Sequence, residues 1–132
     1  MRHAFIRANL LLALFVGCGS SGIDRPVVSI DAPLDTDGVQ RVKIDMHSYY
    51  FEPNRIVVHA GHPVELALHN CSHIVPHNFT LVGGGVNVSE SKWGWGSDKV
   101  TFTPTTPGEY RFFCHKGSHE KKGMVGTLVV LE

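Results

Sequence analysis

Three side chains that can bind a soft metal ion lie close together near the end of the chain. Cys114 is followed five residues later by His119, and Met124 comes five residues after that. A thiolate and a thioether suit Cu(I), whereas an imidazole binds both Cu(I) and Cu(II). This set of donors predicts a copper site at which the metal can gain and lose one electron.

A fourth donor has to come from another part of the chain, and His77 is the best candidate. It stands in the sequence VPHNF, at the start of a predicted strand. Two His and one Cys in a trigonal array, with a weak and long axial Met, form the ligand set of blue copper sites. A bound copper ion would also keep the Cys114 thiol deprotonated. A rigid scaffold would hold the metal nearly still during electron transfer, and that lowers the barrier.

The segments that must position these donors have the pattern of β-strands. Apolar and polar residues alternate with a period of two, which is typical of half-buried strands, and no convincing helical stripe is present. Turn-rich sequences separate the runs, and the glycines at 83–85 open a predicted long loop that extends to residue 98. We expect an all-β sandwich of seven to eight strands. The alternating runs lie at residues 42–46, 56–58, 64–68, 79–81, 100–102, 110–114 and 125–131.

The combined pattern resembles the cupredoxin family, in particular the small blue copper proteins of the plastocyanin, azurin and auracyanin type. The resemblance covers about residues 42–131 and implies a Greek-key β-sandwich. It rests on the sequences YYFEPNRIVVHAG at 49–61, PHNF at 76–79, PGEY at 107–110, the spacing C-x4-H-x4-M from Cys114, and GTL at 126–128.

This resemblance implies a role for each residue of the predicted site. His77, Cys114 and His119 would be the equatorial copper ligands, and Met124 would be the axial ligand. Asn78 would tie the two ligand-bearing loops together and form a hydrogen bond near the thiolate, outside the ligand set itself. The implied protein is a one-electron carrier with a single type 1 copper ion and transient redox partners, and is not an enzyme.

Other readings of the same residues stay open at this point. A copper storage or delivery module would use the same ligands without an electron-transfer partner. A catalytic copper enzyme ranks lower, since the sequence has no evident second copper motif. A Cys2His2 zinc site from Cys71, His77, Cys114 and His119 would leave Met124 unexplained. We therefore interpret Cys71 as a partly buried free thiol.

Two further features lie next to the predicted ligands. His115 directly follows Cys114, so on a strand its side chain points to the opposite face, and we expect it at the surface. Trp93 and Trp95 stand in the predicted loop. They form either an exposed patch for docking a redox partner or a cover for the end of the sandwich.

The first segment has the features of an export signal. Residues 1–17 combine the basic Arg2 and Arg7 with an apolar run at 10–16, which is typical of a secretory signal peptide. A small residue directly before Cys18 resembles the bacterial lipoprotein processing site. That implies cleavage before Cys18 and lipidation of its thiol. The alternative is an ordinary secretory signal followed by an incidental cysteine.

The next segment, residues 18–38, is expected to be a flexible tether. Residues 19–38 contain no aromatic residue but several Gly, Ser, Pro and Asp, so the segment buries little apolar surface. A first strand near residues 27–30 is the alternative. In either case we expect the copper-binding domain at residues 39–132. We expect an exported protein on the periplasmic side of a bacterial membrane, attached through the lipid on Cys18.

Composition excludes several classes of protein. The 132 residues contain 12 Lys and Arg against 12 Asp and Glu, which gives a formal net charge of zero. That balance argues against a nucleic-acid-binding protein with a broad basic surface. Hydrophobic residues make up 42% and charged residues 18%, as in ordinary globular domains. No apolar run approaches the roughly 20 residues of a membrane-spanning helix.

Overall fold

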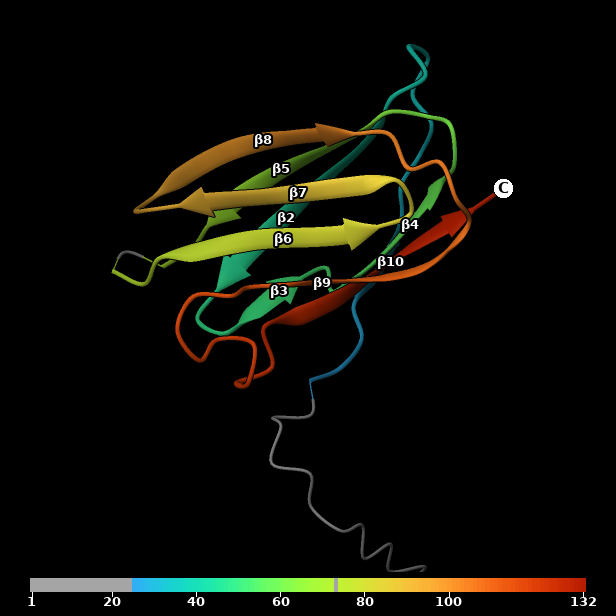
Figure 1. Ribbon diagram of the computed structural model, residues 1–132. Coiled ribbons are helices and arrows are strands. Elements are labelled where there is room, and N and C mark those ends of the chain that lie inside the picture. Colours follow the sequence, from blue (N-terminus) through green and yellow to red (C-terminus); the bar gives the residue numbers. More distant parts are fainter. Residues whose placement is uncertain (1–24, 73) are drawn as a thin grey trace, which may run out of the picture.

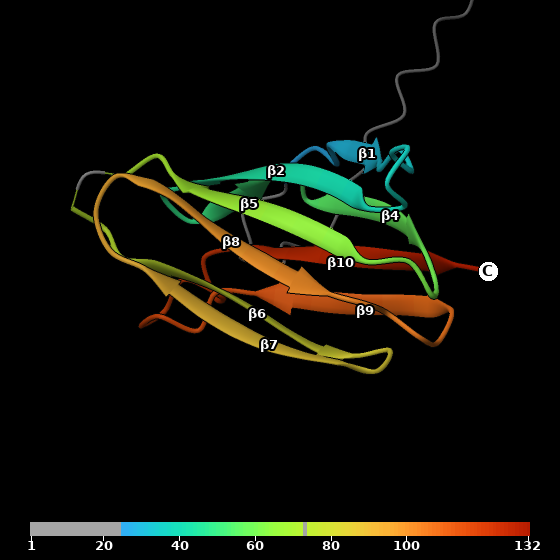
Figure 2. The same ribbon diagram turned by 90° about the horizontal axis from the view of Figure 1, so that it is seen from above.

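The computed structural model describes residues 25–72 and 74–132, which form two packed β-sheets (Figure 1). The described strands are β1 (Ser29–Asp31), β2 (Gln40–His47), β3 (Tyr50–Glu52), β4 (Arg55–His59), β5 (Val64–Asn70), β6 (His77–Gly83), β7 (Val86–Lys92), β8 (Gly96–Phe102), β9 (Gly108–Phe113) and β10 (Val125–Leu131). One sheet has the order β1-β4-β10-β9-β6-β7, and the other has the order β3-β2-β5-β8. Figure 2 shows the sheets as two layers. No helix in the described ranges is long and apolar enough to cross a bilayer.

The core lies between the two layers and follows directly from the alternating pattern. Every second residue of β2 and β5 is buried, while their neighbours face outward. Three aromatic rings meet inside the core: Phe112 lies 5.3 Å from Phe51 and 5.1 Å from Phe79 between ring centroids. Burial of apolar surface stabilises such a core by roughly 25 cal/mol per Å². The same packing holds β9, which leads to Cys114, in a fixed position.

The predicted all-β sandwich is confirmed, with ten strands in the described ranges instead of seven to eight. The largest difference falls on the predicted loop at 83–98, where the chain forms β7 and begins β8. β7 is the edge strand of its sheet, and its residues 89–91 are all exposed. Only Val86 and Val88, at the start of β7, pack on the core, so the alternation is too short to identify a strand from the sequence.

The expected tether also requires a correction, because residues 25–38 are part of the described fold. β1 pairs in parallel with β4, with Ser29 opposite Arg55. The side chain of Asn54 accepts a hydrogen bond of 2.9 Å from the backbone N–H of Val28. Backbone pairing with the edge of β4 fixes this segment without requiring aromatic burial. The described fold therefore includes residues before Val39, in agreement with the alternative of an early strand.

The register of three strands determines where the predicted donors meet. In the antiparallel pair β9–β10, Phe113 lies opposite Val125. In the antiparallel pair β6–β9, Phe113 lies opposite Thr80. The end of β9, the start of β10 and the start of β6 therefore share one end of the sandwich (Figure 1).

Candidate metal centre

Each of the four predicted ligands stands at or next to the end of a strand. His77 is the first residue of β6, and Cys114 directly follows β9. His119 lies in the loop between β9 and β10, and Met124 directly precedes β10. Strands fix the backbone on both sides of that loop, so the four side chains have little freedom to move apart.

The structure brings three of these side chains into one cluster. The possible ligand atoms of His77, Cys114 and His119 all lie within 4.8 Å of one another. The sulfur of Cys114 is 3.4 Å from Nδ1 of His119, and the two imidazole rings lie 5.2 Å apart between centroids. Metal bonds of about 2.0–2.3 Å to nitrogen and sulfur place donor atoms roughly 3.3–4 Å apart. Small side-chain shifts would therefore let all three atoms contact a single ion.

Met124 lies beside this cluster and is fully buried. Its backbone N–H donates a hydrogen bond of 3.0 Å to the carbonyl oxygen of His119, and its carbonyl oxygen accepts one of 3.1 Å from the N–H of Cys114. These two bonds close the loop between the thiol and the thioether. The backbone positions of three predicted ligands are therefore directly linked.

His77 is a fully buried imidazole, and neither of its ring nitrogens has a hydrogen-bond partner within the described part of the chain. Leaving a buried polar group unpaired costs about 1–3 kcal/mol. Burial, together with the smaller effect of the charges of His119 and His47, lowers the pKa of His77 to about 4. Near neutral pH the ring is uncharged and offers a free lone pair. This is the state that binds a metal ion.

The pKa of His119 is lowered in the same direction as that of His77. Burial lowers the pKa of His119, and the positive charge of Lys122 adds to the effect. Both imidazoles therefore favour the neutral form. With the sulfur of Cys114, their two nitrogens make a donor set that suits a soft or borderline cation.

Asn78 links the two segments that carry His77 and Cys114. Its backbone N–H donates to the sulfur of Cys114 at 3.4 Å. Its side-chain oxygen accepts a bond of 2.7 Å from the N–H of His115, and its amide nitrogen donates to Thr80 at 2.7 Å. Sequence reasoning found Asn78 but missed Thr80, whose hydroxyl lies 3.0 Å from Nδ1 of His115.

Comparison with known proteins decides the family. A family model described as "Cupredoxin-like domain" matches residues 10–130. The chain belongs to the cupredoxin family. No curated protein sequence matches the chain.

Solved structures agree with this assignment. Auracyanin A, described as a "blue" copper protein from Chloroflexus aurantiacus, is 25% identical, with a TM-score of 0.62 and coverage of 71% of this chain and 100% of that one. An auracyanin from Roseiflexus castenholzii, at 21% identity, has a TM-score of 0.64 over 70% of this chain and 97% of that one. The metal-binding domain of the Streptococcus pneumoniae Cu(I)-exporting ATPase CopA, at 20% identity, also scores 0.64, over 82% and 100%. The last two matches show the shared fold.

Tyr49 contacts His119 in the cluster, and this contact could not be predicted from the sequence. Tyr49, between β2 and β3, places its ring edge-on to His119 with the centroids 4.9 Å apart. The ammonium group of Lys122 lies 3.9 Å from the centroid of the same ring. Tyr49 has a φ of 73°, which is uncommon for a bulky residue. Only the folded chain brings this turn to the ligand loop, so no local motif could reveal the contact.

Three other residues of this cupredoxin that the sequence singled out lie outside the predicted ligand set: Cys71, His115 and Trp93. Cys71 is half-buried, and both described thiols are free. Cys71 belongs to a second group, with Asp45 and His47, and this does not support the four-residue zinc alternative. His115 is exposed, as predicted. Trp93 is also exposed, with 71% of its surface accessible.

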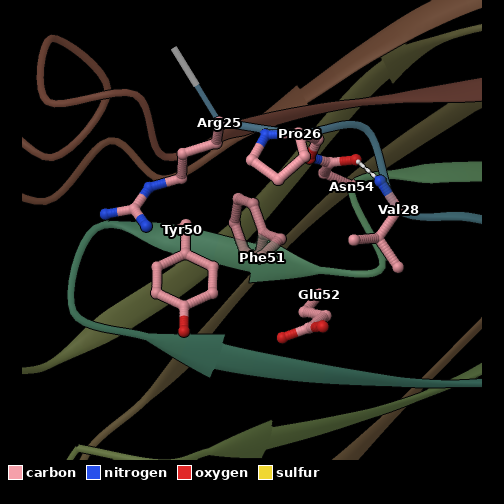
Figure 3. A pocket seen from close by; sticks show the side chains of 7 residues that line it. All are labelled: Arg25, Pro26, Val28, Tyr50, Phe51, Glu52 and Asn54. Carbon is pink, nitrogen blue, oxygen red and sulfur yellow. Dashed lines mark hydrogen bonds between the residues drawn. The ribbon is translucent and has the colours of Figure 1, made fainter. Parts of the chain in front are cut away.

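A pocket of about 210 Å³ lies next to the group of Asp45, His47 and Cys71, because its lining residues Tyr50 and Glu52 both contact His47 (Figure 3). The guanidinium group of Arg25 stacks over the ring of Tyr50 there, 4.1 Å from its centroid. None of the seven described residues that line the pocket is a Cys or a His, so it offers no soft metal donors. The lining residues are Arg25, Pro26, Val28, Tyr50, Phe51, Glu52 and Asn54.

Proposed function

We propose that this cupredoxin is a one-electron carrier with a single type 1 copper site. His77, Cys114 and His119 are the equatorial ligands in this proposal, and Met124 is the axial ligand. The observation that carries it is the convergence of one thiol and two imidazoles, two of them fully buried, with His77 otherwise unpaired within the described residues. When bound, copper supplies the redox couple between Cu(I) and Cu(II).

The residues of the chain supply rigidity and insulation around that couple. The N–H of Asn78 donates to the Cys114 sulfur, which spreads the charge of a thiolate and orients it. The hydrogen bonds between Cys114, His119 and Met124 hold the loop in one conformation. A site that keeps its shape in both oxidation states has a small reorganisation cost, and this supports fast electron transfer.

His119 is the proposed port through which electrons enter and leave. Of the four donors, only His119 is partly exposed, whereas the other three are fully buried. Its imidazole therefore gives a short path between the metal and a partner at the surface. Tyr49 and the nearby Lys122 border this exposed edge. Transient redox proteins would dock over such a small patch.

We further propose that the protein is not an enzyme and that it works at a membrane surface. Four protein donors match the complete ligand set of a type 1 site, which supports a carrier role. Lipidation at Cys18 would anchor the protein on the periplasmic side of a bacterial membrane, within reach of membrane redox complexes. The signal peptide at 1–17 and Cys18 lie outside the described residues, so this rests on the sequence.

A copper-handling module is the second candidate function. One observation favours it, namely the structural match to the metal-binding domain of a Cu(I)-exporting ATPase, which covers 82% of this chain. The two functions differ in how firmly the metal is held. A carrier retains copper in both oxidation states, whereas a delivery module releases Cu(I) readily to a competing ligand.

Visible absorption and electron paramagnetic resonance of the purified protein with added Cu(II) test the carrier proposal. An intense thiolate-to-copper band and a narrow hyperfine splitting are expected, and both should be lost in Cys114→Ser. Cys71→Ser is the matched control and should keep both signals. A colourless protein that instead binds zinc tightly in this cluster would overturn the proposal. Rapid loss of Cu(I) to a chelator, with no reversible redox wave, would favour the delivery module.

A further inference from the structure

We propose that Asp45, His47, His69 and Cys71 form a second metal site that binds Zn²⁺ on the outer face of the four-stranded sheet. The inference is independent of the copper site, since it uses none of the same side chains. Strand register, the separations between donor atoms and the chemistry of the donor set support this second site.

The register of two strands brings the four residues together. β2 and β5 are neighbouring parallel strands (Figure 2), with Asp45 opposite His69 and Met46 opposite Asn70. Asp45 and His47 stand two positions apart on β2, and His69 and Cys71 are likewise two positions apart at the end of β5. Residues two apart on a strand point to the same face. Asp45, His47 and Cys71 therefore form one group on this face, and His69 contacts two of its members, Asp45 and Cys71.

That face is the outer one. The intervening Met46 and Asn70 are fully buried, whereas the four proposed ligands are all half-buried. An incoming ion can therefore reach the cluster from solvent. The apolar core beneath and the sheet backbone on either side hold the donors in place.

Two of the printed separations between donor atoms already suit a tetrahedral ion, and the contact between His69 and Asp45 is a hydrogen bond that would have to lengthen by about half an ångström. Nδ1 of His69 is 2.9 Å from Oδ1 of Asp45 and 3.4 Å from the sulfur of Cys71. The sulfur of Cys71 is 3.6 Å from Oδ1 of Asp45. The donors of Asp45, His47 and Cys71 all lie within 4.8 Å of one another. Tetrahedral zinc with bonds of about 2.0–2.3 Å requires donor separations of roughly 3.3–3.8 Å.

The chemistry of the set favours Zn²⁺ over copper. One thiolate and one carboxylate balance the two positive charges, and two neutral imidazoles complete a four-coordinate site. The cluster contains no thioether, and Cu(II) would oxidise a half-exposed thiol. Burial and the charge of Asp45 raise the pKa of Cys71, so the free thiol is protonated at neutral pH. Binding forms a Zn–S bond and releases that proton to water.

Two charged neighbours, Lys43 and Glu52, contact different members of the cluster. Nζ of Lys43 lies 2.8 Å from Oδ1 of Asp45, and Oε2 of Glu52 lies 3.7 Å from Nε2 of His47. Burial alone would raise the pKa of Asp45, but hydrogen bonds from Lys43 and His69 outweigh it and lower that pKa. Asp45 is therefore an ionised carboxylate. Because Lys43 is well exposed, its ammonium group can swing into solvent when an ion arrives.

The same residues do not form a nucleophilic triad. In a triad the acid and the nucleophile contact opposite nitrogens of the histidine. Here Asp45 and Cys71 both contact Nδ1 of His69. Three donors that converge on one point suit a bound ion better than proton relay along an imidazole.

Zinc titration of the Cys114→Ser protein tests the proposal, because this variant lacks the thiol of the copper cluster. We expect one equivalent of Zn²⁺ that depends on Cys71, measured by competition with a chromophoric chelator. Adding Cys71→Ser should remove it, and adding His47→Gln should weaken it at least tenfold. His62→Gln, in the turn between β4 and β5, is the matched control for His47→Gln and should bind zinc as before.

A second measurement guards against a variant that merely misfolds. Zinc should protect Cys71 from alkylation in the otherwise unchanged protein, as read from the modified peptide by mass spectrometry. Absence of zinc binding, zinc binding that survives Cys71→Ser, or alkylation of Cys71 at an unchanged rate would each overturn the proposal.

Discussion

The two donor clusters of this cupredoxin differ in burial and in hydrogen bonding. His77 and Cys114 are fully buried, and the imidazole of His77 has no hydrogen-bond partner among the described residues. Asp45, His69 and Cys71 are half-buried and contact one another. The buried cluster is unfavourable without an ion, whereas the half-buried cluster satisfies its own polar groups. The first is therefore suited to permanent occupancy and the second to exchange.

The two clusters also differ in the chemical types of their donors. The buried cluster offers a thiol and two imidazoles beside a thioether, and such a soft set tolerates both Cu(I) and Cu(II). The half-buried cluster replaces the thioether with the carboxylate of Asp45, which favours a divalent ion of fixed charge. Similar residue types therefore support different metal chemistry, and burial and the fourth donor make the difference.

Metal removal should give the largest contrast between the two clusters. A chelator in excess should strip zinc from the Cys71 cluster orders of magnitude faster than it strips copper from the Cys114 cluster. The reason is that release from the buried cluster requires local opening of the ligand loop. Dialysis with metal analysis over time measures both rates on one sample. Equal rates would contradict the distinction drawn from burial.

Asn78→Ala should weaken the buried cluster and leave the half-buried one unchanged. The substitution removes the acceptor for the N–H of His115 and the donor to Thr80. Losing these bonds should lower the free energy of unfolding by about 2–3 kcal/mol. Denaturant titration measures this loss, and zinc binding should keep its affinity. Asn87→Ala, at an exposed position on the edge strand β7, is the matched control and should change stability by less than about 0.5 kcal/mol.

The buried cluster was more predictable from sequence than the half-buried one. Three of its donors lie within eleven residues, on one loop between two alternating runs, so their proximity follows from chain connectivity. His77 required a separate motif. The half-buried cluster depends on the parallel register that sets Asp45 opposite His69. Such pairing across more than twenty residues is a property of the folded sheet and leaves no local signal.

The strands likewise divide into those that the sequence predicted and those that it missed. Strands with one buried face, such as β2 and β5, were predicted because their core side requires apolar residues at every second position. The edge strands β1 and β7 were assigned to a tether and a loop, because backbone pairing can hold an edge without that pattern. Sequence therefore predicts the parts of the fold that bury side chains better than those held by backbone hydrogen bonds.

Acid should destabilise the metal-free protein through the buried cluster. The pKa of His77 is about 4 in the fold and about 6.5 in an unfolded chain. Between these values the unfolded state binds more protons, so stability falls as pH drops from 6.5 to 4, by about 2–3 kcal/mol. Denaturant titrations at several pH values measure the slope. His77→Leu keeps the side-chain volume and should flatten it, and an unchanged slope in this variant would rule out His77 as the cause.

Met124→Leu should give the smallest change and should separate the axial donor from the rest of the buried cluster. Because the two side chains have similar volume, the free energy of unfolding should fall by less than about 1.5 kcal/mol. The thiolate-to-copper band should persist, since its donor Cys114 is intact. The reduction potential should rise, because a weak donor that stabilises Cu(II) is lost. Cyclic voltammetry measures that shift, and an unchanged potential would mean that the sulfur of Met124 does not bind the metal. Zinc affinity at Cys71 is the internal control, since no thioether belongs to that cluster.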